Sequence, residues 1–183
     1  MLLRVVLDAN VLFPFTLRDT LLRAAAVGFF QVYWSEQILD EAGRNLMATG
    51  RMTQAQVHHL MTALSKAFPE ALVSGHEPFI AQMLNHKKDR HVAAAAFKAD
   101  AGLIVTSNLK DFRKLPEGLK AISPDLFLLG LLEQDPGLML ALLQNQARAL
   151  ERPPVTFDEL LTGLARSVPR FAQRVGALLP ADD

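Results

Sequence analysis

The segment that decides the fold is VVLDANVL, residues 5–12, in which an apolar run ends abruptly at Asp8. Residues 2–7 are nearly all apolar, as expected for a strand that is buried on both faces of a sheet. Such a strand usually lies in the centre of a parallel sheet, and its carboxyl end opens onto the crevice where these sheets bind ligands. Asp8 therefore stands where a site of chemistry is expected.

A second segment of the same kind is GLIVTSNLKDF, residues 102–112. Its apolar strand runs into Ser107, Asn108 and Asp111. Because the carboxyl ends of parallel strands meet at one edge of a sheet, Asp8 and Asp111 are expected to lie near each other. The two segments together predict an acidic, metal-binding site.

The composition limits the class of protein. The chain has 183 residues, half of them apolar, and fits one domain or one domain with a helical extension. The absence of cysteine excludes disulfides, thiolate zinc sites and cysteine nucleophiles. With 19 basic and 19 acidic residues the net charge is zero, which gives poor support for a nucleic-acid partner. No apolar run approaches the roughly 20 residues of a membrane-spanning helix, and no signal peptide is recognised, so we expect a cytoplasmic protein.

Strand and helix signals alternate through the first part of the chain. The expected strands are residues 3–7, 30–34, 103–106 and 120–123, with a weak segment at 71–73. The expected helices are residues 16–28, 35–50, 53–68, 78–84 and 89–102, and residues 85–88 are expected to form a loop. Strands that alternate with helices of ten or more residues predict right-handed crossovers and a parallel α/β sheet.

Beyond Pro124 the strand signals stop. The segments 125–134 and 137–150 are leucine-rich helices, the segment 156–168 begins with a capping box, and Pro169 can open a last helix. We therefore predict two parts, residues 1–128 and residues 129–183. The apolar helices of the second part must pack on the first part, on a second copy of the chain or on a partner.

The helix 35–50 offers further carboxylates to the site. On a helical wheel Asp40 lies opposite the apolar face, while Glu36 and Glu41 lie on its two rims, so the wheel does not choose between them. Asp89, at the start of the helix 89–102, has the ordinary role of an N-cap, which need not exclude metal binding.

The acids point to a cation when they are taken as a set. Carboxylates gathered at one sheet edge repel one another and take up protons unless a cation offsets their charge. Mg²⁺ and Mn²⁺ favour oxygen ligands. Such ions orient a phosphodiester and activate water in nucleases, so the pattern favours metal-assisted phosphoryl transfer.

Four segments now show a specific resemblance: VVLDANVL, SEQILDEAGRNL, DRHVAAAAFKADAGLIVTSNLKDF and AISPDLFL. In order and spacing they resemble PIN-domain proteins, most closely the VapC-like toxin ribonucleases, over about residues 1–128. The helical tail resembles the extension of some longer VapC-like proteins. The resemblance implies a Rossmann-like parallel sheet flanked by helices and a Mg²⁺- or Mn²⁺-dependent endoribonuclease. It also implies a cognate antitoxin, and a homodimer is plausible given the apolar helices.

The resemblance assigns the site residue by residue. The catalytic and metal-binding acids are Asp8, Glu41, Asp89 and Asp111. Some PIN proteins carry an acid at the place of Asn108, so here Asp111 must fill that role, directly or through water. Asn10 and Ser107 are expected to orient these ligands.

Basic side chains surround Asp89 in the segment HKKDRH, residues 86–91. Lys87, Lys88 and Arg90 are expected to contact the RNA backbone, since phosphate contacts dominate affinity for nucleic acids. A solvated loop is the ordinary alternative for such charges. In residues 13–15, Phe13 and Phe15 could stack bases, although packing in the core or a dimer contact is the more common role.

Two other functions fit parts of this sequence. A haloacid-dehalogenase-like phosphatase needs a second aspartate two residues after the first, and Asn10 stands at that place. A PIN fold that binds RNA or a protein without cutting remains open, because of Asn108 and the neutral net charge. Metal-dependent stabilisation would favour the enzyme over this binding module.

Overall fold

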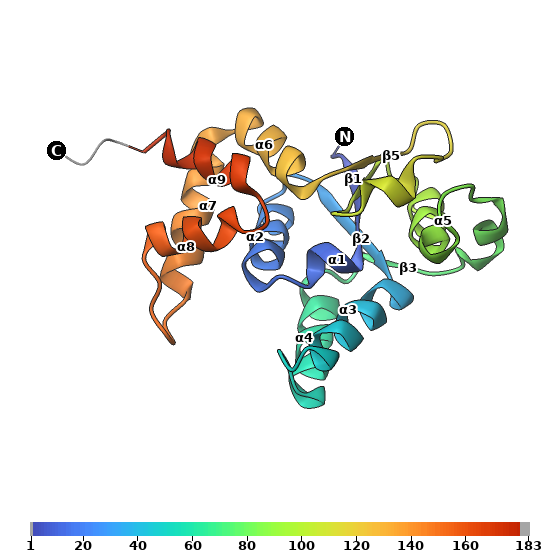
Figure 1. The fold of residues 1–183 in the computed structure, drawn as a ribbon, viewed down its shortest axis with the longest axis horizontal. Coiled ribbons are helices and arrows are strands. Elements are labelled where there is room, and N and C mark those ends of the chain that lie inside the picture. The colour runs from blue at the N-terminus through green and yellow to red at the C-terminus, as the bar shows by residue number, and fades with distance from the viewer. Residues whose placement is uncertain (1, 180–183) are drawn as a thin grey trace. The chain divides into compact units, whose positions relative to one another are not determined.

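The computed structural model describes residues 2–179, which fall into two compact units (Figure 1). The first unit contains the residues up to Phe13 together with Phe30–Ile122, and the second contains Pro14–Phe29 together with the residues from Ser123 onward. The first unit holds a five-stranded sheet and the second is helical. Each unit is described by itself below.

The sheet of the first unit is parallel throughout and has the order β3-β2-β1-β4-β5. Its strands are β1 (Arg4–Leu7), β2 (Gln31–Ser35), β3 (Leu72–Val73), β4 (Leu103–Val105) and β5 (Lys120–Ile122). The parallel α/β sheet predicted from the alternation of strands and helices is thus confirmed.

The central strand is β1, as its apolar sequence predicts. Val5, Val6 and Leu7 have no exposed surface, and β1 pairs with β2 on one side and β4 on the other. The backbone N–H of Asp8 donates to the carbonyl of Val105 at 3.1 Å, so the pairing with β4 extends to the acid itself. Asp8 therefore stands at the carboxyl end of the most enclosed strand.

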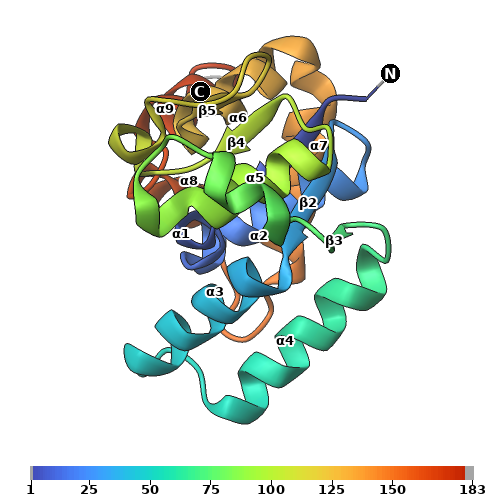
Figure 2. The ribbon, with the colours of Figure 1, turned by 90° about the vertical axis from the view of Figure 1, so that its right-hand side faces the viewer.

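The helices of the first unit place further side chains at the same edge. They are α1 (Ala9–Leu12), α3 (Glu36–Ala48), α4 (Gln54–Ala67) and α5 (Arg90–Lys98), with the 3-10 turns η1 (Glu77–Gln82), η2 (Lys87–Asp89) and η3 (Leu109–Phe112). Figure 2 shows α3 and α4 side by side, and α5 packs against β1, β2 and β4. Because α5 leads back into β4, it begins at the edge where β1 and β4 end.

The local structure differs from the sequence prediction in its shortest elements. The turns α1 and η3 were not predicted, the expected loop 85–88 includes part of η2, and the expected helix 78–84 is the 3-10 turn η1. The turn α1 forms because the Asp8 carboxylate accepts a hydrogen bond from the N–H of Ala9 at 2.7 Å. A four-residue helix carries too little periodicity to be recognised in a sequence.

The second unit consists of helices packed on one another. They are α2 (Phe15–Ala26), α6 (Pro124–Gln134), α7 (Pro136–Ala149), α8 (Phe157–Ala165) and α9 (Pro169–Gly176). The predicted capping box of Thr156 and Glu159 is confirmed at the start of α8. The leucine-rich helices bury their apolar faces in this unit, and α2 contributes to it by packing against α7 and α8.

Among residues 2–179, no single helix is long and apolar enough to cross a membrane. The consecutive helices α6 and α7 reach the required length and composition only as a pair, and the chain bends by 118° between them.

Candidate active site

Asp8 is the most enclosed acid of the site. Its side chain is 4% exposed, and Oδ2 accepts hydrogen bonds from the Thr106 hydroxyl at 2.7 Å and from Asn10 Nδ2 at 2.8 Å. The pKa of Asp8 is raised to about 6, mainly by burial and to a smaller extent by the charges of Asp89 and Glu41, while its hydrogen bonds to Thr106 and Ala9 act to lower it. The carboxylate is thus held firmly in an environment that disfavours its charge.

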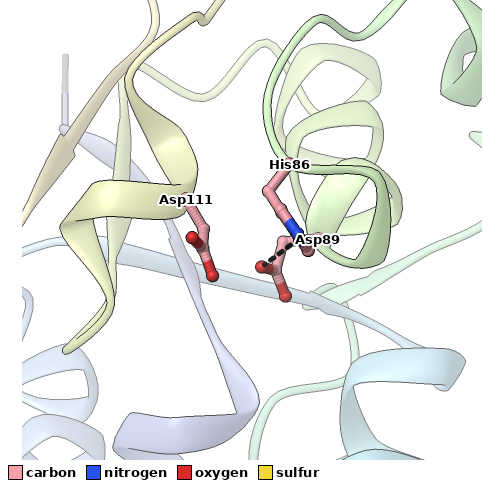
Figure 3. A group of neighbouring side chains, drawn as sticks. All are labelled: His86, Asp89 and Asp111. Atoms are coloured by element: carbon pink, nitrogen blue, oxygen red, sulfur yellow. Dashed lines mark ion pairs between the residues drawn. The ribbon is translucent and has the colours of Figure 1, made fainter.

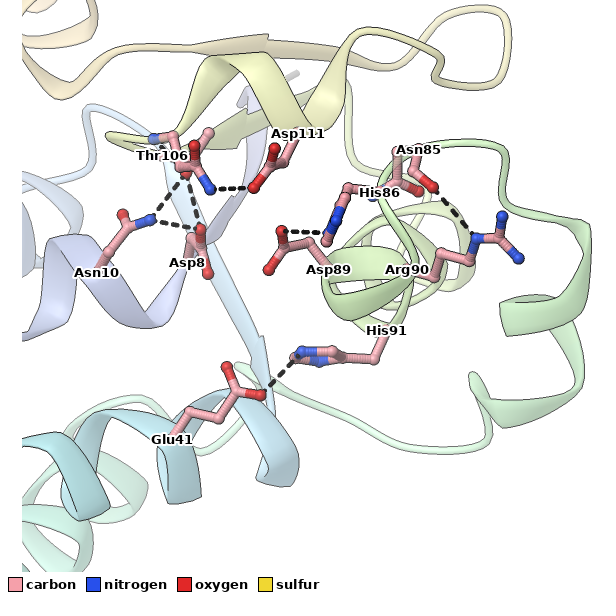
Figure 4. A network of polar contacts seen from close by, with 11 residues as sticks. Asp8, Asn10, Glu41, Asn85, His86, Asp89, Arg90, His91, Thr106 and Asp111 are labelled. Carbon is pink, nitrogen blue, oxygen red and sulfur yellow. Dashed lines mark hydrogen bonds and ion pairs between the residues drawn. The ribbon is translucent and has the colours of Figure 1, made fainter.

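Asn10 and Thr106 form a clamp around Asp8 (Figure 4). Asn10 Nδ2 also donates to the Thr106 hydroxyl at 3.0 Å, and the Asn10 carbonyl oxygen accepts from the backbone N–H of Ser107 at 3.0 Å. The Thr106 hydroxyl further accepts from the backbone N–H of Asn108 at 3.1 Å. These bonds join the start of α1 to the end of β4 and fix the orientation of the carboxylate. Ser107 takes part through its backbone, while its side chain is exposed.

Asp89, Asp111 and His86 form a second cluster (Figure 3). One ligand atom from each lies within 4.8 Å of the others. The backbone N–H of His86 donates to the carbonyl of Asp111 at 2.9 Å, which ties the loop before α5 to η3. The side-chain amide of Asn108 donates to Asp111 Oδ2. Asn108 thus orients Asp111, the acid expected to take the role of the carboxylate that some PIN proteins carry at position 108.

The Asp89 carboxylate is available to a ligand. It precedes α5, but its side chain makes no N-cap hydrogen bond, so the expected capping role is wrong. Its buried Oδ2 atom lies 3.9 Å from His86 Nδ1 and has no hydrogen bond among residues 2–179. Burial first, and then the charge of Asp111, raises the pKa of Asp89.

Glu41 reaches the site from α3 and lies against His91 of α5 (Figure 4). Its Oε1 atom is 3.2 Å from His91 Nε2, although the two groups lack the alignment of a hydrogen bond. Burial raises the pKa of Glu41, and burial lowers the pKa of His91 to about 4. His91 is therefore a neutral imidazole beside the carboxylate at pH 7.

Glu36 and Glu41 lie in different surroundings in the structure. Glu36 is exposed and, with Asp40, lines a separate cavity of about 500 Å³ between α3, α4 and β3. Glu41 instead raises the pKa of Asp8 through its charge, which places the two carboxylates within electrostatic reach of each other.

The four acids meet the requirements of a hard divalent cation. Asp8 senses the charges of Asp89 and Glu41, and Asp89 senses that of Asp111. The donors are oxygen atoms, one of them a buried carboxylate oxygen without a hydrogen bond among the described residues. Burial is the main cause of the raised pKa values of Asp8, Glu41 and Asp89, and the charges of neighbouring acids add to it at Asp8 and Asp89. A cation bound among these carboxylates would favour their ionised form.

The basic residues near Asp89 have different surroundings. Lys87 and Lys88 are exposed on η2. Arg90 is half-buried, and its Nε atom donates to the carbonyl of Asn85 at 3.1 Å. The two lysines are thus free to meet a ligand at the mouth of the site, while Arg90 also braces the loop before α5.

Comparison with known families agrees with this architecture. A family model described as a PIN domain matches residues 4–110. This range includes the strands β1 to β4 and three of the four acids, and it ends just before Asp111. The chain belongs to the PIN-domain family. A second model, described as the VapC50 C-terminal domain, matches residues 124–177 of this PIN protein. The chain is also 38% identical over 123 residues to "Putative ribonuclease VapC50" of Mycobacterium tuberculosis, covering 66% of this chain and 73% of that protein.

Sequence reasoning missed several groups of this site. His86 and His91 were noted only as charges near Asp89, and Thr106 was not singled out. The signal for Thr106 was its place directly after the buried strand β4, opposite Asp8 at the end of β1. The signal for His91 was its position two residues after Asp89, in the first turn of the alanine-rich helix α5.

Proposed function

We propose that this PIN-domain protein is a divalent-metal-dependent endoribonuclease and the toxin of a toxin–antitoxin pair. The observation that carries the proposal is the convergence of Asp8, Glu41 and Asp89 on one sheet edge with raised pKa values. Asp111 supplies the fourth carboxylate beside Asp89. The printed name of the mycobacterial relative supports the choice of RNA as substrate.

Asp8 and Asp89 are the residues that would hold Mg²⁺ or Mn²⁺. The clamp of Asn10 and Thr106 fixes the Asp8 carboxylate before a ligand arrives, and the unbonded Oδ2 of Asp89 needs no rearrangement. When bound, the ion would neutralise charge on the phosphodiester and polarise it. The preformed ligands lower the entropic cost of assembling the site.

Glu41 and Asp111 act on the attacking water in this proposal. Burial raises the pKa of Glu41 toward neutral pH, which suits a group that accepts a proton at an Oε atom. His91 keeps water from the other side of that carboxylate because it is 4% exposed. Asp111 is held by Asn108 and His86, and can orient the water from the opposite side.

Lys87, Lys88 and Arg90 would contact the RNA backbone. The exposed amino groups of the two lysines flank Asp89, and the charge of Lys88 reaches both Glu41 and Asp89. These cations would offset the repulsion between the acids and the phosphates of the substrate. The substrate would be a single-stranded or unstacked segment, because PIN chemistry at a recessed acid cluster needs an accessible phosphate.

The match to the VapC50 C-terminal domain supports a toxin with a cognate antitoxin partner. We further propose a homodimer and a cytoplasmic location, as for other intracellular toxins of this type. Coexpression with any small reading frame found next to the gene tests the antitoxin, and size-exclusion chromatography of the protein alone tests the dimer.

Cleavage of a mixed RNA pool by the purified protein tests the activity. Mg²⁺ or Mn²⁺ is supplied, with a chelator as one control and the variants Asp8→Asn and Glu41→Gln as others. Asp40→Asn is the matched control, since this exposed acid stands one residue from Glu41 outside the cluster. Cutting that needs the metal, Asp8 and Glu41, but not Asp40, supports the nuclease. Binding of RNA without cutting in any metal would instead support the binding module.

A further inference from the structure

A pocket of about 280 Å³ lies beside the acid cluster, within the first unit. It is lined by Asn10, Phe13, Asn45, Ala48 and Thr49. The first two belong to α1 and its C-cap, and the other three belong to α3 and its C-cap. Neither the acids nor the basic loop before α5 take part in its walls.

The pocket continues the active site along α1 and α3. Asn10 is hydrogen-bonded to the Asp8 carboxylate, and Phe13 follows Asn10 at the three-residue spacing that puts two side chains on one helix face. Asn45 follows Glu41 at the four-residue spacing, one turn or about 5.4 Å further along α3. Each wall of the pocket therefore contains a residue within four positions of one of the acids, Asn10 near Asp8 and Asn45 near Glu41.

One polar group in the pocket remains available. The Asn10 amide is already bonded to Asp8, Thr106 and the backbone of Ser107. The Thr49 hydroxyl donates to the carbonyl of Asn45 at 2.8 Å. The side-chain amide of Asn45 is exposed and makes no hydrogen bond among residues 2–179. It offers one donor and one acceptor side by side.

One lining residue of the pocket is aromatic, and a cation lies over its ring. Phe13 is half-buried, and the guanidinium of Arg51 lies 4.6 Å from the centre of its ring. A ring of this kind stacks on the flat face of a base, and an arginine beside it attracts the adjoining phosphate. Ala48 is the smallest side chain of the lining and leaves room for a flat group.

We propose that this pocket binds one nucleobase of the RNA next to the cleaved phosphate and that Asn45 selects the base. This inference rests on the proposed ribonuclease function. The Asn45 amide pairs with the donor and acceptor pattern on a base edge, while Phe13 supplies stacking that is the same for every base. An apolar side chain of a protein partner would use the ring but would leave the amide without a partner.

Mapping the ends of the fragments cut from a randomised RNA pool tests the proposal. The wild-type protein should prefer one base at a position adjoining the cut, and Asn45→Ala should reduce that preference about ten-fold. Gln37→Ala is the matched control, because it removes an exposed amide from the same helix outside the pocket and should leave the preference intact. Phe13→Leu should weaken RNA binding for all bases alike.

The result that overturns the base pocket differs from the one that overturns the nuclease. Cutting with a base preference that survives in Asn45→Ala, or cutting with no preference beside the cut, would exclude base selection by Asn45. If the wild-type protein cuts nothing, the nuclease fails, and the pocket is tested by binding. Homopolymers of the four bases should then bind with a preference that Asn45→Ala abolishes, and equal binding of both proteins would exclude the pocket.

Discussion

A buried polar pair in the helical unit differs from the buried polar groups around Asp89 and His91 in the sheet unit. In the helical unit, the hydroxyl of Thr20 lies 2.9 Å from Gln146 Oε1, and Gln146 Nε2 donates to the carbonyl of Thr16 at 3.2 Å. In the sheet unit, Asp89 Oδ2 and both nitrogens of His91 are buried without a hydrogen bond among residues 2–179. Thr20 and Gln146 have no exposed surface, and His91 is 4% exposed, so burial alone does not separate the two regions.

This difference distinguishes buried polar groups that stabilise the fold from buried polar groups that are left for a ligand. A buried polar group costs free energy unless a partner satisfies it, and a folded protein tolerates the cost where a ligand is meant to supply the partner. Thr20 and Gln146 complete each other and specify how α2 meets α7. Asp8 and Asp89 have raised pKa values, which a bound cation would lower.

The largest expected effect is the loss of RNA cleavage in the variant Asp8→Asn. Because Asp8 is proposed to hold the ion and its carboxylate accepts hydrogen bonds from three donors, we expect the cleavage rate to fall about 10³-fold in a fixed-time RNA assay. Gln146→Leu should leave the rate per folded molecule unchanged. Equal losses in both variants would mean that Asp8, like Gln146, serves the fold.

Divalent metal should stabilise the sheet unit through its unsatisfied acids. Mg²⁺ or Mn²⁺ at about 100 times its dissociation constant should raise the free energy of unfolding by about 2.7 kcal/mol. The gain should disappear in Asp89→Asn and persist in Asp40→Asn, as measured by denaturant unfolding with and without chelator. A gain of the same size in all three proteins would place the ion elsewhere.

Breaking the satisfied pair in the helical unit should lower stability without touching metal binding. Gln146→Ala leaves the buried Thr20 hydroxyl without its side-chain partner, so we expect a loss of about 2 kcal/mol in the free energy of unfolding. The double variant Thr20→Val with Gln146→Leu should recover part of that loss, because it removes both polar groups. Full additivity of the two changes would argue against their coupling.

The sequence predicted the acids that stand at the ends of elements. Asp8 follows the buried strand β1, and Asp89 precedes α5, so both positions follow from the topology of a parallel sheet. Glu41 could not be told from Glu36 by periodicity, because both lie on the rim of the apolar face. Only the resemblance to PIN domains chose between them, and only the packing of α5 beside α3 gives a physical reason.

What the sequence could not predict depends on contacts between distant residues. Thr106 bonds to Asp8 across 98 positions, and no local pattern marks a threonine for that role. The helix α2 has an ordinary amphipathic sequence, yet it packs with α7 and α8. The division of the chain after residue 128 remains a prediction about domains.

A pH dependence of stability is also expected from Asp8. Its pKa is about 6 in the folded protein and 3.8 when unperturbed, so the folded state binds its proton more tightly than the unfolded chain. This contribution to stability is complete below pH 3.8 and is lost as the pH rises to about 6. At 1.36 kcal/mol per pKa unit the loss is at most about 3 kcal/mol.

Comparison with Asp8→Asn in chelator isolates this effect. Asparagine does not titrate, and the loss of an acceptor for one hydrogen bond lowers its stability by about 1 kcal/mol equally at every pH. We therefore expect the stability of the variant relative to the parent to rise by about 2 kcal/mol between pH 4 and pH 7 in urea titrations. A fall over this range would mean that folding favours the ionised carboxylate, and Asp8 would then be a satisfied structural group like Gln146. The expected rise would mean that the acid is held at a cost, which is what a preformed cation site requires.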